Sequence, residues 1–324
     1  MKKRISSGLK KVKNDAIFYT ARAMFAFARL VPISVGLRIG AAIGGCAWRF
    51  LGYERNCVMN HLKVAFPDWT DEKRAATGKE AFRNLGRSFF ELFHFPELLA
   101  TVNGPNPYVD IRGKENLDKA LEKGIGVIFF TGHVGNWEIM AASLAARGYK
   151  GGEIVRSLYD ERIDKLLNDH RRKFNYRPLT RGGPELVADI VELLSSNEML
   201  ALLMDQDTKV RGVFADFFGK PAWTPSGPAY LCRMSGIDAL MLTVHRRPEG
   251  GHMVEISPPV PRPQTGDAKA DTLAYTQTMN RMLCEHISRH PTEWVWMHRR
   301  WKTRPEGEPA ELHPAPRPKK PWRY

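Results

Sequence analysis

Short apolar runs alternate along the chain with longer stretches in which apolar residues recur every three or four positions. The runs predict buried strands and the longer stretches predict amphipathic helices. The predicted strands are 124–130, 151–158, 198–207, 238–247 and 252–260, with a further short strand opening the stretch 108–124. The predicted helices are 54–66, 70–95, 138–147, 160–174, 183–196, 227–236 and 269–291, with one more closing 108–124. Strands that alternate with helices indicate an α/β fold, with a central, mainly parallel or mixed sheet flanked by helices.

Prolines and capping residues set several helix boundaries. Pro67 is expected to end the helix 54–66, and Pro96 to end the helix 70–95. Thr70 is the residue type that caps a helix N-terminus, because its hydroxyl can accept a hydrogen bond from a free backbone N–H. These signals place the helices independently of their apolar pattern.

The first fifty residues form a basic, apolar segment that we expect to associate with a membrane. A spanning helix needs about 20 nearly uncharged residues, whereas Arg22, Arg29 and Arg38 interrupt this stretch. A pair of interfacial amphipathic helices broken near Pro32 fits better, and the alternative is a helical hairpin in the core of a soluble domain. If the segment anchors the chain, its flanking lysines place the body on the cytoplasmic side. The predicted organisation is therefore 1–50 membrane-associating, 51–305 one α/β domain, and 306–324 a loose tail rich in Pro and Lys.

The stretch "FFTGHVGNWE" carries the main chemical signal. It joins a predicted strand to a predicted helix, with Gly132 and Gly135 permitting a tight turn and Asn136 as the N-cap. His133 then lies on the turn and Glu138 in the first helical turn, so the two side chains can converge. Such a turn also offers free backbone N–H groups that favour negative charge. A zinc site is not expected, because no third ligand accompanies the pair; a structural histidine is the remaining alternative.

Charge and cysteine content narrow the class of protein. The formal net charge is +14, which indicates anionic partners such as nucleic acid, a membrane surface or phosphorylated substrates. The four cysteines show no paired spacing and are read as reduced thiols. The stretch "WVWMHRRWK" near the C-terminus mixes indoles with cations. That mixture suits a membrane interface or stacking on nucleic acid.

Several spaced blocks, in order, resemble one known family. They are "ERNCVMNHLKVAFPD", "SFFELF", "TGHVGNWE", "MDQDTKVRGVFADFFGKPAWTPSGPAYL" and "EWVWMHRRWKTRP", which together span most of residues 50–305. The chain resembles the late acyltransferases of lipid A biosynthesis, and His133 with Glu138 matches the HxxxxD/E motif of glycerolipid-type acyltransferases. The resemblance implies transfer of a lauroyl- or myristoyl-like chain to a hydroxyl of a lipid A precursor.

Such a transfer needs a general base, because an unactivated hydroxyl is a weak nucleophile. The resemblance assigns this role to His133, with Glu138 holding the imidazole tautomer. No serine or cysteine lies beside the histidine, which favours direct transfer over an acyl-enzyme. Backbone N–H groups near Gly132, Gly135 or Asn136 are candidates for binding the thioester oxyanion. Candidate substrate-binding residues are Arg156, Arg171, Arg172, Arg181, Asp205, Gln206, Lys220 and Thr224.

The resemblance also implies the partners. The acyl donor is expected to be acyl carrier protein, the acceptor an anionic, phosphorylated glycolipid, and the location the cytoplasmic face of the bacterial inner membrane. No cofactor, metal or nucleic acid is expected. Two alternatives stay open: an acyltransferase for another hydroxylated lipid, such as a lysophospholipid, and a basic nucleic-acid-binding protein.

Overall fold

A computed structural model describes residues 14–15, 18–20, 22–23, 28–158, 160–174 and 176–308. The first thirteen residues, which carry most of the N-terminal lysines, and the tail from residue 309 onward lie outside these ranges. The predictions made for those two segments are therefore left as predictions.

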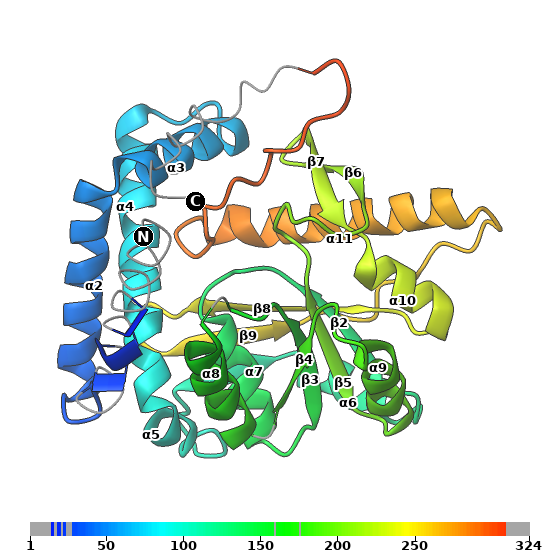
Figure 1. Cartoon of the computed structure of the whole chain (residues 1–324), viewed down its shortest axis with the longest axis horizontal. Coiled ribbons are helices and arrows are strands. Elements are labelled where there is room, and N and C mark those ends of the chain that lie inside the picture. The colour runs from blue at the N-terminus through cyan, green and yellow to red at the C-terminus, as the bar shows by residue number, and fades with distance from the viewer. Residues whose placement is uncertain are drawn as a thin grey trace, which may run out of the picture.

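A sheet of seven strands, among the described residues, forms the centre of the molecule in the order β1-β9-β8-β2-β5-β3-β4 (Figure 1). Its strands are β1 (Val109–Arg112), β2 (Val127–Thr131), β3 (Gly151–Val155), β4 (Tyr176–Thr180), β5 (Met199–Leu203), β8 (Leu240–Arg246) and β9 (His252–Ile256). Neighbouring strands run parallel except β8 and β9, which pair antiparallel. The predicted α/β fold with a central, mostly parallel sheet is confirmed.

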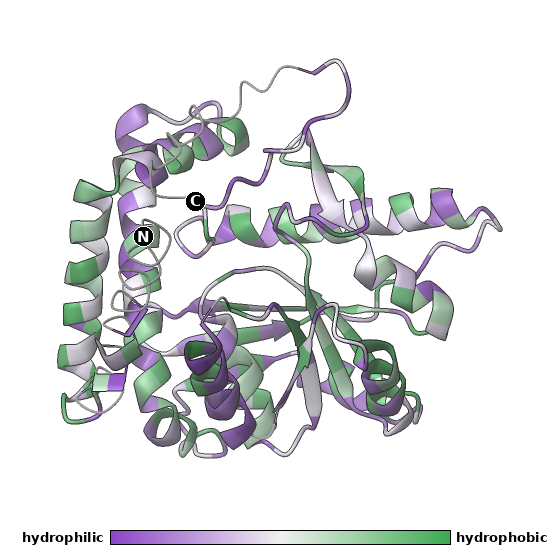
Figure 2. Cartoon of the chain, viewed as in Figure 1, coloured by the Kyte–Doolittle hydropathy of each residue, from purple (hydrophilic) through white to green (hydrophobic). Residues whose placement is uncertain are grey.

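Helices cover both faces of this sheet because its strands are apolar on both sides. In β2, Ile128 and Phe130 enter one buried cluster, whereas Val127 and Phe129 enter the other, as the alternation of side chains along a strand requires. The first cluster is covered by α3 (Gly52–Ala65), α9 (Leu186–Ser195), α10 (Gly227–Ser235) and α11 (Ala268–Arg289). The second is covered by α5 (Phe95–Leu99), α6 (Lys114–Leu121), α7 (Trp137–Ala146) and α8 (Glu161–Lys173). Figure 2 shows the strongly hydrophilic surface of α8 in purple against the green central strands.

Two long helices, α2 (Ile33–Phe50) and α4 (Asp71–Glu91), pack along one side of the molecule (Figure 1). Their backbones approach closely through glycines: a Cβ on Gly40 would lie 2.4 Å from the carbonyl oxygen of Gly86. Pro32 immediately precedes α2, at the predicted break. Among the described residues, no helix combines the length and apolar character needed to span a membrane.

Most predicted elements are confirmed, but Pro96 does not end a helix. Thr70 caps α4 as expected, accepting a hydrogen bond from the N–H of Lys73. The helix ends at Glu91, a short 3-10 turn η1 (Leu92–His94) follows, and Pro96 lies in the first turn of α5. Proline is well suited to that position because the first helical N–H groups have no intrahelical partner.

Two features were not predicted. The strand β4 contains Pro178, which a strand tolerates only at an edge or a bulge, and β4 is the edge strand of the sheet. A separate antiparallel hairpin, β6 (Gly212–Phe217) with β7 (Lys220–Pro225), forms in a stretch to which no element was assigned.

The tryptophan-rich stretch near the C-terminus lies in the protein core, not at a surface. Trp294, Trp296 and Trp301 are at most 2% exposed, and Arg300 is fully buried. Arg300 donates hydrogen bonds to the Trp223 carbonyl and lies over the ring of Phe217. The expectations of a membrane-interface belt or a nucleic-acid stacking surface at this stretch were therefore wrong.

Candidate active site

A tight turn between β2 and α7 presents His133. Gly135 has a φ of 55°, and a Cβ there would meet the carbonyl oxygen of Val244 at 2.4 Å, so the turn requires glycine. Asn136 caps α7, its side-chain oxygen accepting a hydrogen bond from the N–H of Ile139. The predicted strand–turn–helix unit and its N-cap are confirmed.

The carboxylate that holds the His133 imidazole belongs to Asp205, at the end of the neighbouring strand β5. Nδ1 of His133 lies 2.8 Å from Oδ1 of Asp205, and the backbone N–H of His133 donates to Oδ2 at 2.7 Å. Gly132 permits this approach, because a Cβ there would come within 3.0 Å of the same carboxylate. With an ionised Asp205 accepting from Nδ1–H, the imidazole keeps a lone pair on Nε2.

Asp205 is fixed in its ionised form. Burial opposes ionisation and alone would raise its pKa, but the charge and hydrogen bonds of His133 and the Trp294 indole hold the pKa at about 2. The indole N–H of Trp294 donates to Oδ2 at 2.7 Å. Asp205 was predicted as a substrate-binding residue, but its oxygens are occupied by the histidine and the indole, and it does not line the cavity.

Glu138 contacts an arginine and a tyrosine and makes no hydrogen bond to His133. Arg171 donates to both of its carboxylate oxygens, at 2.5 and 3.1 Å, and the hydroxyl of Tyr176 donates at 2.7 Å. Burial would raise the pKa of Glu138, but the hydrogen bonds and charge of Arg171 lower it below its usual range. The role of holding the imidazole tautomer, predicted for Glu138, is filled by Asp205.

A second buried carboxyl group shares Arg171. Glu153 on β3 has Oε1 2.9 Å from Nε of Arg171. Burial, followed by repulsion from Glu138, raises the pKa of Glu153 to about 8. Glu153 is therefore mostly protonated at neutral pH. The single positive charge of Arg171 is then balanced by the single negative charge of Glu138.

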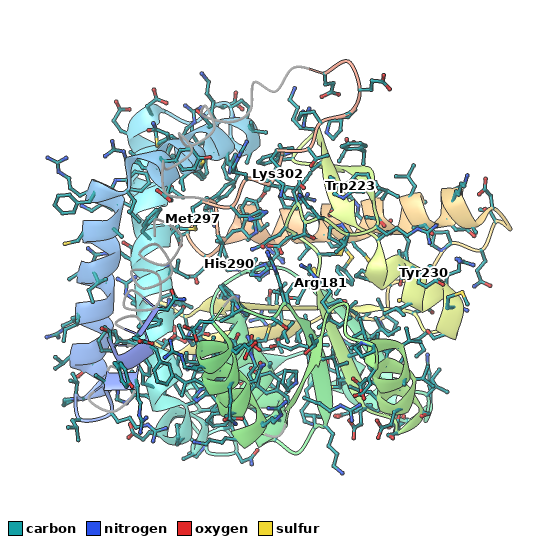
Figure 3. All side chains as sticks on the ribbon, viewed as in Figure 1. Arg181, Trp223, Tyr230, His290, Met297 and Lys302 are labelled. Atoms are coloured by element: carbon teal, nitrogen blue, oxygen red, sulfur yellow. The ribbon has the colours of Figure 1, made fainter. Side chains whose placement is uncertain are left out.

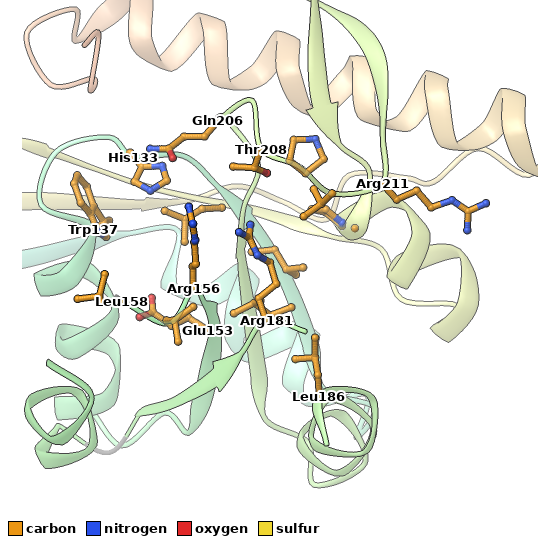
Figure 4. A pocket seen from close by; sticks show the side chains of 18 of the residues that line it. His133, Trp137, Glu153, Arg156, Leu158, Arg181, Leu186, Gln206, Thr208 and Arg211 are labelled. Atoms are coloured by element: carbon orange, nitrogen blue, oxygen red, sulfur yellow. The ribbon is translucent and has the colours of Figure 1, made fainter. Parts of the chain in front are cut away.

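The carboxyl ends of four neighbouring strands meet at this edge of the sheet. His133 follows β2, Asp205 follows β5, Arg156 follows β3 and Arg181 follows β4. His133, Arg156 and Arg181 border a cavity of about 610 Å³, together with Glu138, Arg171 and Gln206. Asp205 lies behind His133 and does not line it. Figure 4 shows the side chains of Arg156 and Arg181 pointing toward the part of the cavity where His133, Gln206 and Thr208 lie.

The rest of the cavity wall is largely apolar. It is formed by Ile154, Val155, Leu158, Leu167, Leu186, Leu202, Leu203, Val210, Pro225, Pro228 and Tyr230. Arg211 adds another cation that sequence reasoning missed. A cavity with this size and lining can hold an apolar chain beside an anionic group.

Three predicted binding residues lie outside the cavity. Arg172 is 60% exposed and faces Asp169 at 3.5 Å. Lys220 is exposed at the start of β7, and Thr224 is fully buried, where it accepts a hydrogen bond from Arg300. None of the three borders the cavity. Lys220 and Thr224 lie on β7, which belongs to a separate hairpin, and Arg172 lies on the exposed side of α8.

Two backbone N–H groups of the turn between β2 and α7 already donate hydrogen bonds within the protein. The N–H of Gly135 donates to the carbonyl oxygen of Glu293 at 2.7 Å, and that of His133 to Asp205. The expectation that Gly135 supplies an oxyanion donor was therefore wrong. The amide of Asn136 donates to Oε2 of Glu91 at 2.7 Å, so this side chain is occupied in anchoring the turn.

Glu91 was missed by sequence reasoning, although it lies in the quoted block "SFFELF". It is fully buried and accepts hydrogen bonds from Arg246, Tyr108 and Asn136, with His252 at 3.0 Å. Charged and hydrogen-bonding partners lower its pKa despite complete burial. A glutamate inside the apolar run "FFELFHF", residues 89–95, is the signal that such an anchor leaves in the sequence, because a buried charge requires partners.

Comparison with known proteins places these residues in a family context. The family model described as bacterial lipid A biosynthesis acyltransferase matches residues 8–303. The chain is 26% identical to the lipid A biosynthesis lauroyltransferase of Escherichia coli (strain K12), over 86% of this chain and 89% of the relative. It is 27% identical to the lipid A biosynthesis palmitoleoyltransferase of the same strain, over 86% and 88%. It is also 27% identical to the phosphatidylinositol mannoside acyltransferase of Mycobacterium tuberculosis (strain ATCC 25618 / H37Rv), over 68% and 69%.

Proposed function

Since the chain belongs to the bacterial lipid A biosynthesis acyltransferase family and is an acyltransferase, we propose that it moves a lauroyl- or myristoyl-like chain from an acyl-carrier-protein thioester to a hydroxyl of a lipid A precursor. The observation that carries this proposal is the position of the His133–Asp205 pair beside a cavity that is apolar along most of its wall and lined by arginines. The apolar wall suits an acyl chain, and the arginines suit the phosphates of the acceptor.

In the proposed reaction, His133 is the general base. Nε2 takes the proton of the acceptor hydroxyl while the hydroxyl oxygen attacks the thioester carbonyl carbon. The ester bond forms, the carbon–sulfur bond breaks, and the departing thiolate takes the proton from Nε2 of the imidazolium, which regenerates the neutral base. Asp205 orients the imidazole through Nδ1 and stabilises the imidazolium that forms, which is the role of the acid in a catalytic triad.

The arginines are proposed to bind the anionic parts of the substrates. Arg156 and Arg181 border the cavity, and neither has a carboxylate partner among the ion pairs of the described residues. Their charge is therefore available to a phosphate. Arg171 is instead held by Glu138 and Glu153, so we assign Glu138 and Arg171 a positioning role in shaping the cavity.

Membrane association is proposed to occur through α2. Its buried face is a row of glycines against α4, whereas the flank beside that row, about 100° around the helix, leaves large apolar side chains in solvent. These are Val35, Ile39, Ile43 and Phe50, which are between 39% and 80% exposed. An exposed apolar row with nearby cations such as Arg38 and Arg49 suits an anionic membrane surface. We place the enzyme at the cytoplasmic face of the bacterial inner membrane on this basis and on its family.

The acceptor has one specific competitor. One relative named above is a phosphatidylinositol mannoside acyltransferase, so another hydroxylated lipid is the second candidate acceptor. The nucleic-acid alternative loses its aromatic support, because the C-terminal indoles are buried. The cofactor-free and metal-free character of the reaction remains a prediction.

The direct test is to incubate purified enzyme in detergent with acyl-carrier-protein thioesters of several chain lengths. Each is offered with a Kdo-bearing lipid A precursor, a phosphatidylinositol mannoside or a lysophospholipid, and the product masses are measured. We expect acylation of the lipid A precursor and none with His133→Ala. Product formed only from the other acceptors would move the assignment to another lipid, and hydrolysis of the thioester without acylation of any acceptor would contradict the transfer.

A further inference from the structure

Away from the cavity, three histidines and a glutamate meet between the sheet and the end of α11. His245 lies on β8, Glu255 on β9, His286 in the last turn of α11, and His290 directly after it (Figure 3). One ligand atom from each of His245, Glu255 and His290 lies within 4.8 Å of the others. None of these residues borders the cavity at His133.

The fold brings these side chains together through two regular spacings. In the antiparallel pair β8–β9, His245 is opposite Met253, so Glu255 lies diagonally across from His245 on the same face of the sheet. His286 and His290 are four residues apart and therefore lie on one side of α11. Two histidines at this spacing, with further ligands from neighbouring strands, form a common arrangement for a metal site.

The histidines have unused hydrogen-bonding capacity. His286 is fully buried, with Nε2 lacking a hydrogen-bond partner and Nδ1 facing the Glu255 carboxylate at 3.5 Å; Nδ1 of His245 is also buried without a hydrogen-bond partner. The rings of His245 and His290 stack with centroids 3.8 Å apart, and the ring of His286 lies 5.0 Å from that of His290. Buried polar nitrogens without partners are costly, so a ligand that uses their lone pairs would stabilise this region.

We propose that His245, Glu255 and His290 bind one divalent transition-metal ion of the zinc class, with His286 as the adjacent fourth group. Nδ1 of His286 is 3.5 Å from Oε2 of Glu255. A donor set dominated by imidazole favours zinc-like ions over magnesium or calcium, which prefer oxygen. Ligands bound to zinc at about 2.0–2.1 Å lie roughly 3.3 Å apart in a tetrahedron. The stacked rings of His245 and His290 must therefore turn out of their parallel arrangement so that one lone pair of each points at the ion.

Two arginines compete for Glu255 but are free to leave it. Arg112 and Arg289 lie 3.3 Å and 3.8 Å from its carboxylate oxygens. Their side chains are 73% and 60% exposed, so both can turn into solvent at little cost when an ion binds.

The site is connected to the turn that carries His133. The backbone carbonyl oxygen of His290 accepts a hydrogen bond from the N–H of Glu293. The carbonyl oxygen of Glu293 in turn accepts a hydrogen bond from the N–H of Gly135. The next residue, Trp294, donates to Asp205. A bound ion would therefore fix the end of α11 at the start of the segment that supports Asp205 and the His133 turn.

The test uses the full chain in detergent after treatment with a chelator. Zn²⁺ binding is measured by calorimetry and Co²⁺ binding by visible absorption, for the wild type and for His245→Ala, Glu255→Gln and His290→Ala. The matched control is His94→Gln, because His94 pairs with a single glutamate, Glu97, elsewhere in the protein. We expect one ion per chain and a loss of affinity of at least about tenfold in each cluster variant, since loss of outer-shell partners alone costs 10–100-fold.

Thermal unfolding gives a second readout that does not depend on activity. Zn²⁺ should raise the Tm of the wild type and of His94→Gln, because a ligand that binds the folded state stabilises it. The rise should shrink in the cluster variants. If an alanine variant does not fold, Glu255→Gln decides, because it keeps the size of the side chain. Absence of saturable binding, or unchanged affinity in the folded cluster variants, would overturn the proposal.

Discussion

Nδ1 of His133 lies 2.8 Å from Oδ1 of Asp205, although the two residues are 72 positions apart in the sequence. The contact exists because β2 and β5 are neighbours in the sheet and both end at the same edge. It makes Asp205, in our proposal, the residue that orients the catalytic base.

Replacing Asp205 with asparagine tests that assignment. The amide keeps the size of the side chain but cannot stabilise an imidazolium, so kcat should fall by about 10²–10⁴-fold, the usual contribution of a positioned general base. Steady-state kinetics with saturating acceptor measures this loss.

Asp207→Asn is the matched control, since the Asp207 carboxylate is also buried just after β5 but accepts hydrogen bonds from Thr303 and faces Lys302 at 3.5 Å instead of His133. Circular dichroism establishes that both variants are folded. Near-normal turnover by folded Asp205→Asn would remove this residue from the mechanism.

The arginines of the cavity should act mainly on acceptor binding. If Arg156 and Arg181 hold phosphates in the ground state and the transition state alike, alanine at either position raises the KM for acceptor and changes kcat little. One lost charge-assisted contact costs about 1.5–3 kcal/mol, which corresponds to roughly ten- to over a hundredfold in kcat/KM.

Arg172→Ala supplies the comparison, because Arg172 carries the same charge outside the cavity. Kinetics with phosphorylated and dephosphorylated acceptor separates a role in phosphate binding from a role of net charge. Equal losses for all three variants on both acceptors would show that Arg156 and Arg181 do not bind phosphate.

The strand–turn–helix unit was predictable because its signals are local: an apolar run, two glycines and an N-cap asparagine follow one another in the chain. The partner of the histidine was not. Nothing in the sequence states that β5 lies next to β2. The five-residue spacing and the HxxxxD/E resemblance therefore favour Glu138, whereas Asp205 is the carboxylate near in space. The hairpin β6–β7 was missed because its turn is formed by Phe218 and Gly219, both with positive φ, and phenylalanine is not a usual residue there.

The burial of Trp294, Trp296 and Trp301 explains why their predicted role at a surface was wrong. A run of tryptophans and arginines suits an interface and a core equally well by composition. Arg300 shows why the core prevailed: its charge is satisfied inside the protein by the Trp223 carbonyl and the Thr224 hydroxyl.

Glu153 should make stability depend on pH. Its pKa is raised to about 8 in the folded protein, first by burial and then by Glu138, whereas an unfolded glutamate titrates near 4.3. Between these values the folded state holds a proton that the unfolded state has released. Stability contributed by this group is therefore lost as pH rises from about 4.5 to about 8, by up to about 1.4 kcal/mol per pH unit.

Glu153→Gln should remove this slope and stabilise the protein more at about pH 8 than at about pH 5. Urea unfolding across that range measures the difference. Glu192→Gln is the control, because Glu192 is 66% exposed and pairs with Arg177 at the surface. A wild-type slope that persists in Glu153→Gln would mean that other groups cause it.

The exposed row on α2 predicts a separable effect on membrane binding. Ile39 and Ile43 are 39% and 53% exposed, on the flank of α2 beside the glycines that pack against α4. A glutamate at either position places a charge in the apolar face and adds repulsion from anionic lipid, so we expect at least about tenfold weaker partitioning onto anionic vesicles.

Leu273→Glu is the matched control, because Leu273 is 44% exposed on α11, outside this row. Flotation assays with full-length protein compare the three variants with the wild type. Because α2 contacts α4 through its glycines, the substitutions leave that packing intact and the fold should be unchanged by circular dichroism. If Ile39→Glu and Ile43→Glu float like the wild type, or if Leu273→Glu is equally impaired, membrane binding does not depend on this face of α2.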